Sequence, residues 1–362
     1  MNRGLYVLKR FGLAVPVMLF GVTMSFLILY LGPIDPVGSI LGQQATPEDV
    51  RQLRMELNYI DAAGNPIPLW QRYFAVVGDL FTLDFGNSWT IQRETPVAEL
   101  IVNRMPATLW LGFWSVVIAL GVGVPLGLYA GLRANTFRDY ATSGFGIVWR
   151  AMPNFWLAVI ISGLITAGGA LGFYRTAIVE TQVSGTPDAL NNLFSLIHLF
   201  DGVPYLELLF IPVPNPGPMF AAFKWILPAA LVLGSSSMGN EVRIGRTAVL
   251  ESINSKYVET AKAKGLSPRR IIGKHVGRNA IIPLLPVIMG EFYLLIGGSV
   301  LVEAVFGING LGNLFFNAVL GPDIPLVMAL VFIFIVIQIL FNISQDLLYT
   351  YIDPRINLGD SE

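Results

Sequence analysis

The chain has 362 residues, of which 54% are hydrophobic and 13% are charged, and its formal net charge is -1. Soluble proteins carry about 25% charged residues, so this charge deficit and a mean hydropathy of +0.63 exclude a disordered chain and argue against a soluble enzyme. The net charge also argues against a nucleic-acid-binding protein, which is normally basic. The absence of cysteine excludes disulfides, and a total of two histidines makes a histidine metal cluster unfavourable. The composition therefore predicts an integral membrane protein.

Apolar runs of about 20 residues, the length needed to cross a bilayer, recur along the chain. We predict a transmembrane helix within residues 1–32 and five further spans, at 105–132, 144–174, 225–246, 281–306 and 324–349. The span at 225–246 is long enough only because it extends past Glu241. The span at 281–306 is apolar except for Glu291 and Glu303.

The basic residues predict how these spans are oriented. Lys and Arg favour the cytoplasmic side of a membrane, and nine of the 23 fall in residues 241–280. That segment lies in the cytoplasm only if residues 225–246 cross the membrane. We therefore predict an uncleaved first helix, cytoplasmic N- and C-termini with a tail at 350–362, and an external segment at 33–104.

The external segment 33–104 carries helix signals. The run Thr46-Pro47-Glu48-Asp49 is typical of a helix start, with a threonine N-cap, proline at the first helical position and acids at the positive end. A second helix is expected from Pro68 to Leu80. Two interpretations stay open: a small cap over the outer mouth of a pore, or an interfacial helix pair without a role in substrate handling.

A second external loop, 175–224, is rich in proline. Its stretch 211–218 is predicted to be non-helical. One short amphipathic helix is expected earlier in the loop, with an apolar stripe of Leu190, Leu193, Phe194 and Ile197. His198 lies beside that stripe, where a lone histidine is more often structural than a metal ligand. No metal site and no catalytic residue is predicted here or elsewhere.

The cytoplasmic loop 247–280 is the most informative segment. Residues 255–264 suit a short helix, and Gly265 fits its end because glycine accepts the left-handed conformation. Ser267 and Pro268 then begin a second helix. The pattern predicts a helix, a glycine turn and a helix with a basic surface. Charge alone leaves two interpretations open: a loop that docks on another protein, or a solvated loop that contacts anionic lipid.

The same loop resembles the cytoplasmic coupling loop of ABC importer permeases. Residues 257–266 read YVETAKAKGL, which is similar to the Y-V-x-T-A-x-A-K-G-L pattern of the dipeptide and oligopeptide branch. Further landmarks follow in the same order, namely Asp35-Pro36, Asp84–Ser88, Arg104–Leu109, Val302–Phe306 and Asp353–Arg355. The loop 175–224 is longer than is usual in that family. By this resemblance the chain is identified as a type I ABC importer permease, an all-α membrane protein with about six transmembrane helices and a helical external segment after the first span.

The resemblance implies a set of partners in the cell membrane. They are a homologous second permease subunit that completes the pore, two cytoplasmic ABC ATPase subunits, and an extracytoplasmic substrate-binding protein. ATP and Mg²⁺ would be bound by the ATPases and no cofactor by this chain, which agrees with the absence of a G-x-x-x-x-G-K-[ST] motif. The implied cargo is a di- or oligopeptide, with nickel complexes and oligosaccharides as alternatives.

The resemblance also implies which residues couple the permease to its ATPases. They are Tyr257, Glu259, Thr260, Ala261, Ala263, Lys264 and Gly265. In this interpretation the helix acts as a lever, and the small side chains of Ala261 and Ala263 let it sit close in a groove of the ATPase.

Glu291 is a candidate for the translocation pathway. An uncompensated carboxylate at the centre of a span costs about 3 kcal/mol on insertion scales, so it is expected to face the pore or a partner. Three interpretations stay open: contact with the amino end of a peptide in transit, protonation, or pairing with Arg150. An ion-coupled secondary carrier that uses Glu291 is the alternative function, although no repeat between the halves supports it. Glu303 is expected to have a structural role.

Overall fold

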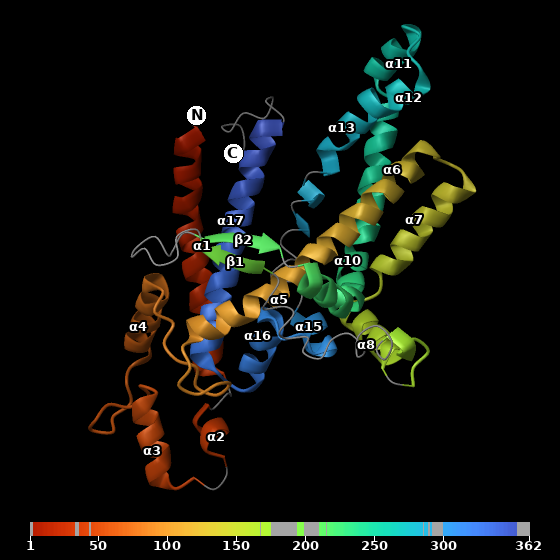
Figure 1. Ribbon diagram of the computed structural model, residues 1–362. Coiled ribbons are helices and arrows are strands. Elements are labelled where there is room, and N and C mark those ends of the chain that lie inside the picture. The colour runs from red at the N-terminus through yellow and green to blue at the C-terminus, as the bar shows by residue number, and fades with distance from the viewer. Residues whose placement is uncertain are drawn as a thin grey trace. The chain divides into compact units, whose positions relative to one another are not determined.

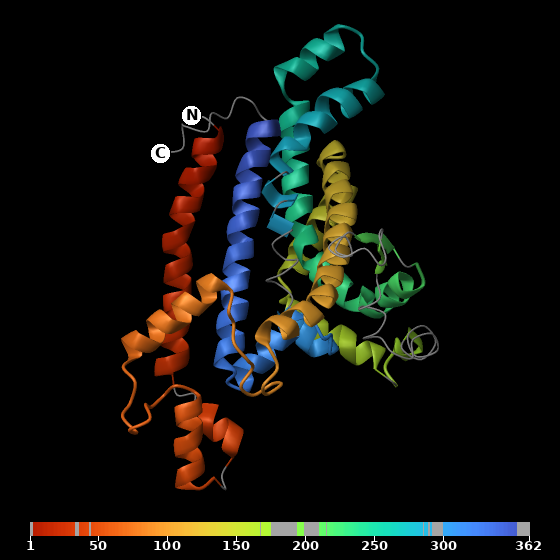
Figure 2. The same cartoon turned by 60° about the vertical axis from the view of Figure 1, so that its left-hand side comes forward.

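The computed structural model describes residues 3–32, 36–42, 45–166, 168–174, 194–198, 210–214, 216–284, 286–288, 290–291 and 300–352. The described part is almost entirely helical and contains one two-stranded sheet (Figures 1 and 2). The chain divides into two compact units. One comprises Met1–Arg104 with Asn313–Glu362, and the other comprises Met105–Gly312.

The first unit is built on two long apolar helices. They are α1 (Arg3–Leu31) and α17 (Ile324–Ile352), which lie side by side in both views (Figures 1 and 2). A Cβ added at Gly21 of α1 would meet the side chain of Ile335 on α17, so the missing side chain lets the helices approach. Arg10 and Asp346 join the same helices by an ion pair of 2.8 Å.

The segment 33–104, which the sequence predicts to be external, forms three helices in this unit, α2 (Pro36–Leu41), α3 (Pro47–Glu56) and α4 (Leu69–Thr82). The predicted start of α3 is confirmed, because the Thr46 hydroxyl accepts the Asp49 N–H at 3.2 Å and the Asp49 carboxylate accepts the Thr46 N–H at 2.9 Å. The Thr46 hydroxyl also donates to the Asp49 carboxylate at 2.6 Å, and this bond, together with the one from the Thr46 N–H, lowers the pKa of Asp49. The second predicted helix is also present, with Pro68 as the N-cap of α4.

One buried carboxylate connects the external segment to α17. Asp323, which is fully buried, precedes α17 and accepts the N–H groups of Thr90 and Ile91 at 3.1 Å each and that of Trp89 at 3.2 Å. The Ser88 hydroxyl donates to the same carboxylate at 2.5 Å. The Leu326 N–H, in the first turn of α17, also donates to Asp323 at 3.4 Å. These donors on one carboxylate fix the loop to the start of the helix.

The second unit is organised around one helix of 38 residues, α10. Its elements in chain order are the continuation of α5 (Val97–Ile118), η1 (Ala119–Gly123), α6 (Val124–Leu132), α7 (Phe137–Arg150), α8 (Asn154–Ile165), β1 (Phe194–His198), β2 (Phe210–Pro214), α10 (Pro216–Ile253), α11 (Lys256–Ala263), α12 (Pro268–Arg270), η3 (Ile271–Gly277), α13 (Arg278–Ala280), η4 (Ile282–Leu284) and α15 (Val300–Phe306); α16 (Leu311–Leu320) begins at its end. A Cβ at Gly127 of α6 would lie 2.8 Å from the backbone oxygen of Glu241 on α10. Glycine there allows α6 and α10 to pack backbone to backbone.

The membrane-spanning elements differ from the predicted set of regular spans. Four helices of the described chain are long and apolar enough to cross a membrane, and they are Lys9–Leu31, Val97–Leu132, Pro216–Ile253 and Ile324–Leu348. Two broken pairs raise the number to six if each pair is one span. One of them, α7 with α8, is bent by 94°, so the predicted span at 144–174 is not a single helix. Pro153, the N-cap of α8, explains the break because it cannot donate to a preceding turn.

The predicted span at 281–306 is not one regular helix either. Residues Ile282–Leu284 form a 3₁₀ turn, and α15 begins only at Val300. Much of the intervening stretch lies outside the described residues. Pro283 explains the tight turn, because proline removes a helical hydrogen-bond donor.

The loop before α10 holds a β-hairpin, and the predicted short helix there is wrong. Strand β1 pairs antiparallel with β2, with Phe194 opposite Pro214 and His198 opposite Phe210. Leu190 and Leu193 of the predicted stripe lie outside the described residues. Both strands of a two-stranded sheet are edges, where proline is tolerated. The predicted non-helical stretch also ends early, because α10 already begins at Pro216, where the first turn needs no donors.

Candidate functional site

The candidate coupling loop is carried by the end of α10. This helix runs on through Glu241 to Ile253, which confirms that the apolar run at 225–240 is extended. At 1.5 Å per residue, 38 residues make a helix of about 57 Å, well beyond the roughly 30 Å of a hydrocarbon core. The helix is therefore long enough to extend beyond a membrane, and α11 and α12 follow at its C-terminal end (Figure 1).

The loop has its own small hydrophobic core. Val258 and Ala261 of α11 are buried against Val249 of α10 and against Ile271 and Val276 of η3. These buried residues show that the loop is folded around a core of its own. The core holds α11 in one position relative to α10, so a force applied to α11 is passed to the long helix.

The predicted glycine turn is confirmed in detail. Gly265 has φ +70°, in the left-handed region. Its N–H donates to the Lys262 carbonyl at 2.9 Å, and the Leu266 N–H donates to the Ala261 carbonyl at 3.3 Å. These two bonds form a Schellman motif, and Leu266 also packs beside Ala261 in the loop core. The second helix starts at Pro268, as expected.

The predicted coupling residues divide into an outer and an inner set. Those exposed on α11 and its end are Tyr257, Glu259, Thr260, Ala263, Lys264 and Gly265. Ala261 is only 3% exposed and packs in the loop core. Its methyl group is therefore not available to a groove of another protein, and its small size serves the packing of α11 onto η3 instead.

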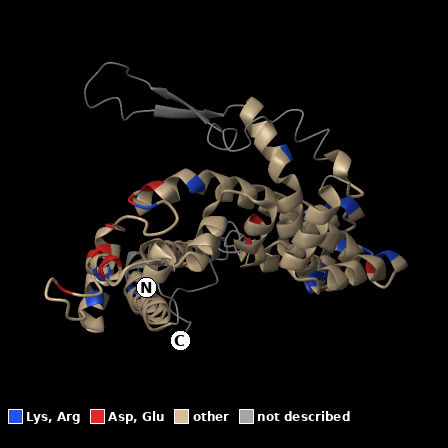
Figure 3. Cartoon of the chain, turned by 90° about the horizontal axis from the view of Figure 1, so that it is seen from below, with Lys and Arg blue, Asp and Glu red and all other residues tan. Residues whose placement is uncertain are grey.

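Basic side chains surround the exposed face of α11. The exposed ones are Lys256, Lys262, Lys264, Arg269, Arg270 and Lys274. Figure 3 shows Lys and Arg in blue gathering at the end of the second unit that carries this loop and the α6–α7 turn. Tyr257, 42% exposed, adds a large aromatic side chain to the same surface. An aromatic anchor within a charged rim is typical of a protein interface.

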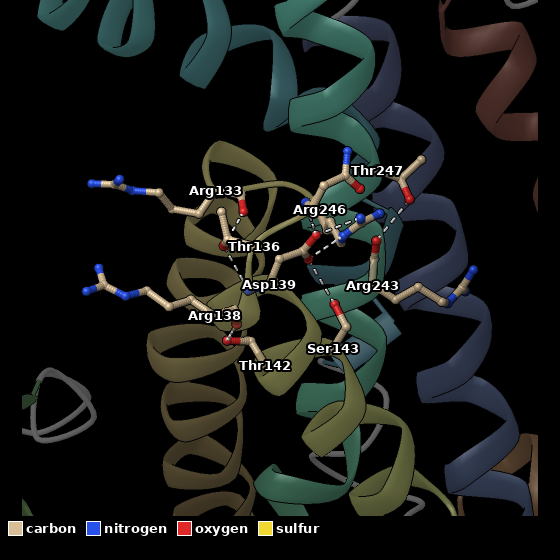
Figure 4. Close-up of polar contacts among 10 residues, drawn as sticks. Arg133, Thr136, Arg138, Asp139, Thr142, Ser143, Arg243, Arg246 and Thr247 are labelled. Carbon is tan, nitrogen blue, oxygen red and sulfur yellow. Dashed lines mark hydrogen bonds and ion pairs between the residues drawn. The ribbon is translucent and has the colours of Figure 1, made fainter.

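An ion pair that the sequence did not indicate joins α7 to α10 (Figure 4). The Arg246 guanidinium donates from Nε to Oδ1 of Asp139 at 2.6 Å and from Nη2 to Oδ2 at 2.8 Å. Asp139 is 1% exposed and also accepts the Asn135 N–H at 2.8 Å and the Ser143 hydroxyl at 3.3 Å. The Thr136 hydroxyl accepts the Asp139 N–H as the N-cap of α7, a local signal of a helix start that does not point to Arg246.

Glu291 lies beside a second carboxyl group rather than beside a base. It is 7% exposed, and its carboxyl interacts with that of Glu241 on α10 and with the Ser237 hydroxyl. Arg150 lies exposed at the end of α7, and within the described residues it forms no ion pair with Glu291. Glu241 entered the sequence reasoning only as an interruption of an apolar run.

Glu303 has the structural surroundings that the sequence favoured. It is fully buried on α15 and accepts the Thr108 hydroxyl at 2.9 Å. Thr108 in turn accepts the Leu311 N–H at 2.7 Å. This chain of hydrogen bonds connects α5, α15 and the start of α16 and leaves Glu303 unavailable to a passing substrate.

Comparison with known proteins agrees with this arrangement. The sequence profile described as "binding-protein-dependent transport system inner membrane component" matches residues 123–358. The oligopeptide transport system permease protein AppB of Bacillus subtilis (strain 168) is 31% identical over 351 residues, which cover 97% of this chain and 98% of the relative. The dipeptide transport system permease protein DppB of Escherichia coli (strain K12) is 30% identical over 355 residues, again 97% and 98% of the two chains.

A solved structure of the MetNI methionine ABC transporter, in an inward-facing conformation, aligns with 71% of this chain and 97% of its own. The identity is 20% and the TM-score 0.47. The family profile spans most of the second unit and all of α17, and the relatives align almost end to end. With its apolar helices and these matches, the chain therefore belongs to the family of inner-membrane components of binding-protein-dependent transport systems, as a multi-pass permease subunit of an ABC importer.

Proposed function

We propose that this permease forms one half of a pore that imports di- or oligopeptides. A homologous second permease completes the pore, two ATPase subunits bind on the cytoplasmic side, and a substrate-binding protein delivers cargo outside. The two relatives named as oligopeptide and dipeptide permeases, which match nearly the whole chain, support the peptide assignment. In this arrangement both termini and the loop 247–280 are cytoplasmic, and the segment 33–104 is external.

The observation that carries the proposal is the preformed α11 at the projecting end of α10. Its Schellman-capped end and buried inner face hold the exposed residues Tyr257, Glu259 and Lys264 in a fixed geometry. A rigid element of this kind loses little conformational entropy when it binds a partner. It therefore suits a docking site that must both bind and transmit force.

The packing of α10 explains how movement of the loop would reach the pore. The Asp139–Arg246 pair joins α10 to α7, and the close contact at Gly127 joins it to α6. These helices therefore move together as one body when the ATPases close on ATP. Such rigid-body motion is a common means of switching between two states. Hydrolysis itself takes place in the partner subunits, and this chain contributes positioning alone.

Reconstituted complex tests the proposal. The permease is co-purified with its partner permease and ATPases and placed in proteoliposomes with the binding protein outside. Uptake of a labelled di- or tripeptide is expected with ATP inside, and not with a non-hydrolysable analogue. Collapse of the proton gradient by an ionophore should leave this uptake unchanged.

Competition identifies the cargo class. An excess of unlabelled peptide should suppress uptake, whereas nickel complexes and oligosaccharides should not. Uptake driven by a pH gradient without nucleotide, or competition by oligosaccharide alone, would contradict the proposal. Tyr257→Ala serves as the docking variant, because it removes the exposed aromatic ring without touching the loop core. It is expected to lower uptake and ATPase binding together.

A further inference from the structure

Glu241 is a buried carboxylate without a hydrogen-bond donor. It lies on α10 with 0% of its surface exposed, and neither carboxylate oxygen has a hydrogen-bond partner among the described residues. Its carboxyl lies against Gly123, where an added Cβ would be 2.9 Å from Oε2. An uncompensated buried carboxylate is costly, because burial removes the water that stabilises its charge. Either a proton or a positive charge must therefore compensate it.

Glu291, the neighbour of Glu241, adds a second buried carboxyl group to the same place. The carboxyl of Glu291 interacts with that of Glu241 and with the Ser237 hydroxyl, which is a donor from the described part of the chain. No ion pair joins either carboxyl to a basic side chain in the described part of the protein. Two neighbouring carboxylates in a buried site repel each other unless a positive charge lies between them. The pair thus provides the acceptors that a compact cation needs.

Irregular backbone lies next to Glu241, because Gly123 of η1 is beside its carboxyl. The π turn η1 and the 3₁₀ turn η4 both pack on α10, and Glu291 follows η4 in the chain. π turns inside helices occur often at functional sites. At membrane depth, non-helical backbone is tolerated where it is buried in protein or lines a water-filled path. The location therefore suits a substrate site better than an ordinary helix contact.

We infer that Glu241 and Glu291 together form a subsite for the terminal ammonium group of a peptide in transit. The inference rests on the proposed function, because it assumes peptide cargo. Glu291 is 7% exposed and Glu241 is fully buried. An ammonium group is compact and carries three donors, which suits two carboxylates and a hydroxyl. Glu241 is in this view a binding residue, and its missing partner is the cargo.

The test compares a peptide with a free amino terminus and the same peptide N-acetylated. Uptake of each is measured per folded complex in the proteoliposomes described above. The readout is the ratio of uptake of the free peptide to uptake of the N-acetylated peptide. Because every variant uses the same binding protein, a change in the ratio is due to the permease. Glu241→Gln and Glu291→Gln keep the shape of the side chain. Each is expected to lower the ratio about tenfold, as expected for loss of a hydrogen bond between charged groups.

Glu251→Gln is the matched control, because Glu251 is an exposed glutamate on the same helix. Its ratio should equal that of the unaltered protein. An unchanged ratio in both Glu241→Gln and Glu291→Gln would overturn the inference and indicate that a proton compensates the pair. An equal fall in uptake of both peptides would also overturn it, in favour of a lysine from the second permease. If the unaltered complex takes up neither peptide, the proposed peptide cargo fails, and the inference fails with it.

Discussion

Substitution of Gly265 tests whether the geometry of the coupling loop, and not merely its charge, is needed for docking. The residue has φ +70°, and no atom lies within 4 Å of the position that a Cβ would take. A side chain there therefore meets no steric obstacle, and the cost of a substitution is that of the left-handed backbone alone. The free-energy cost of the left-handed conformation is about 1–2 kcal/mol for alanine and less for asparagine. Proline cannot adopt this conformation at all.

These costs convert directly into expected affinities. If docking needs the closed turn, Gly265→Ala should weaken binding of the ATPase subunits by about 5- to 30-fold. Gly265→Asn should have a smaller effect. Gly265→Pro also loses the N–H that bonds the Lys262 carbonyl, and a cost of about 3 kcal/mol or more predicts a loss above roughly 100-fold. Biolayer interferometry on detergent-solubilised permease measures these affinities, and uptake in proteoliposomes should fall in the same order.

A second glycine in the same loop provides the control. Gly273 is exposed, lies outside the left-handed region, and also has open space where a Cβ would be. Gly273→Ala should therefore bind the ATPases as the unaltered protein does. Normal affinity and uptake in correctly inserted Gly265→Pro would refute the argument. An equal loss in Gly273→Ala would refute it as well, because the left-handed turn would then not be the cause.

Three further predictions concern the helix contacts. Asp139→Asn should destabilise the complex by about 2 kcal/mol, less than for a fully buried pair because the Arg246 side chain is 28% exposed; an unchanged melting temperature would contradict this. Asp323→Ala leaves several backbone N–H groups without an acceptor and should cost about 3 kcal/mol or more, seen as faster proteolysis in the external segment; protease resistance equal to the unaltered protein would count against it. Asp49 stabilises the start of α3 fully above its ordinary pKa of 3.8 and loses this effect as pH falls through its lowered value. Thr46→Ala should raise the pKa of Asp49 toward its ordinary range, and a carboxyl ¹³C titration of the full-length protein that shows no rise would refute the capping role.

Local signals in the sequence were sufficient for the external helices and the coupling loop. The capping box at Thr46 and the turn at Gly265 involve residues within six positions of each other, so their hydrogen bonds depend on the neighbouring sequence alone. Apolar runs likewise predicted the long helices, because the length needed to cross a bilayer is a property of one segment. The resemblance of residues 257–266 to peptide permeases added the family.

The arrangement of charges was decided by tertiary packing. Asp139 and Arg246 are 107 positions apart, and they meet only because glycines let α6, α7 and α10 approach closely. The burial of Ala261 likewise depends on how η3 folds back onto α11. Glu241 and Glu291 each resembled an isolated charge within an apolar run, and their juxtaposition follows from the packing of two separate segments. A hydrophobic pattern in the sequence indicates that a segment is buried. Only the contacts between helices determine which buried charged residues become neighbours.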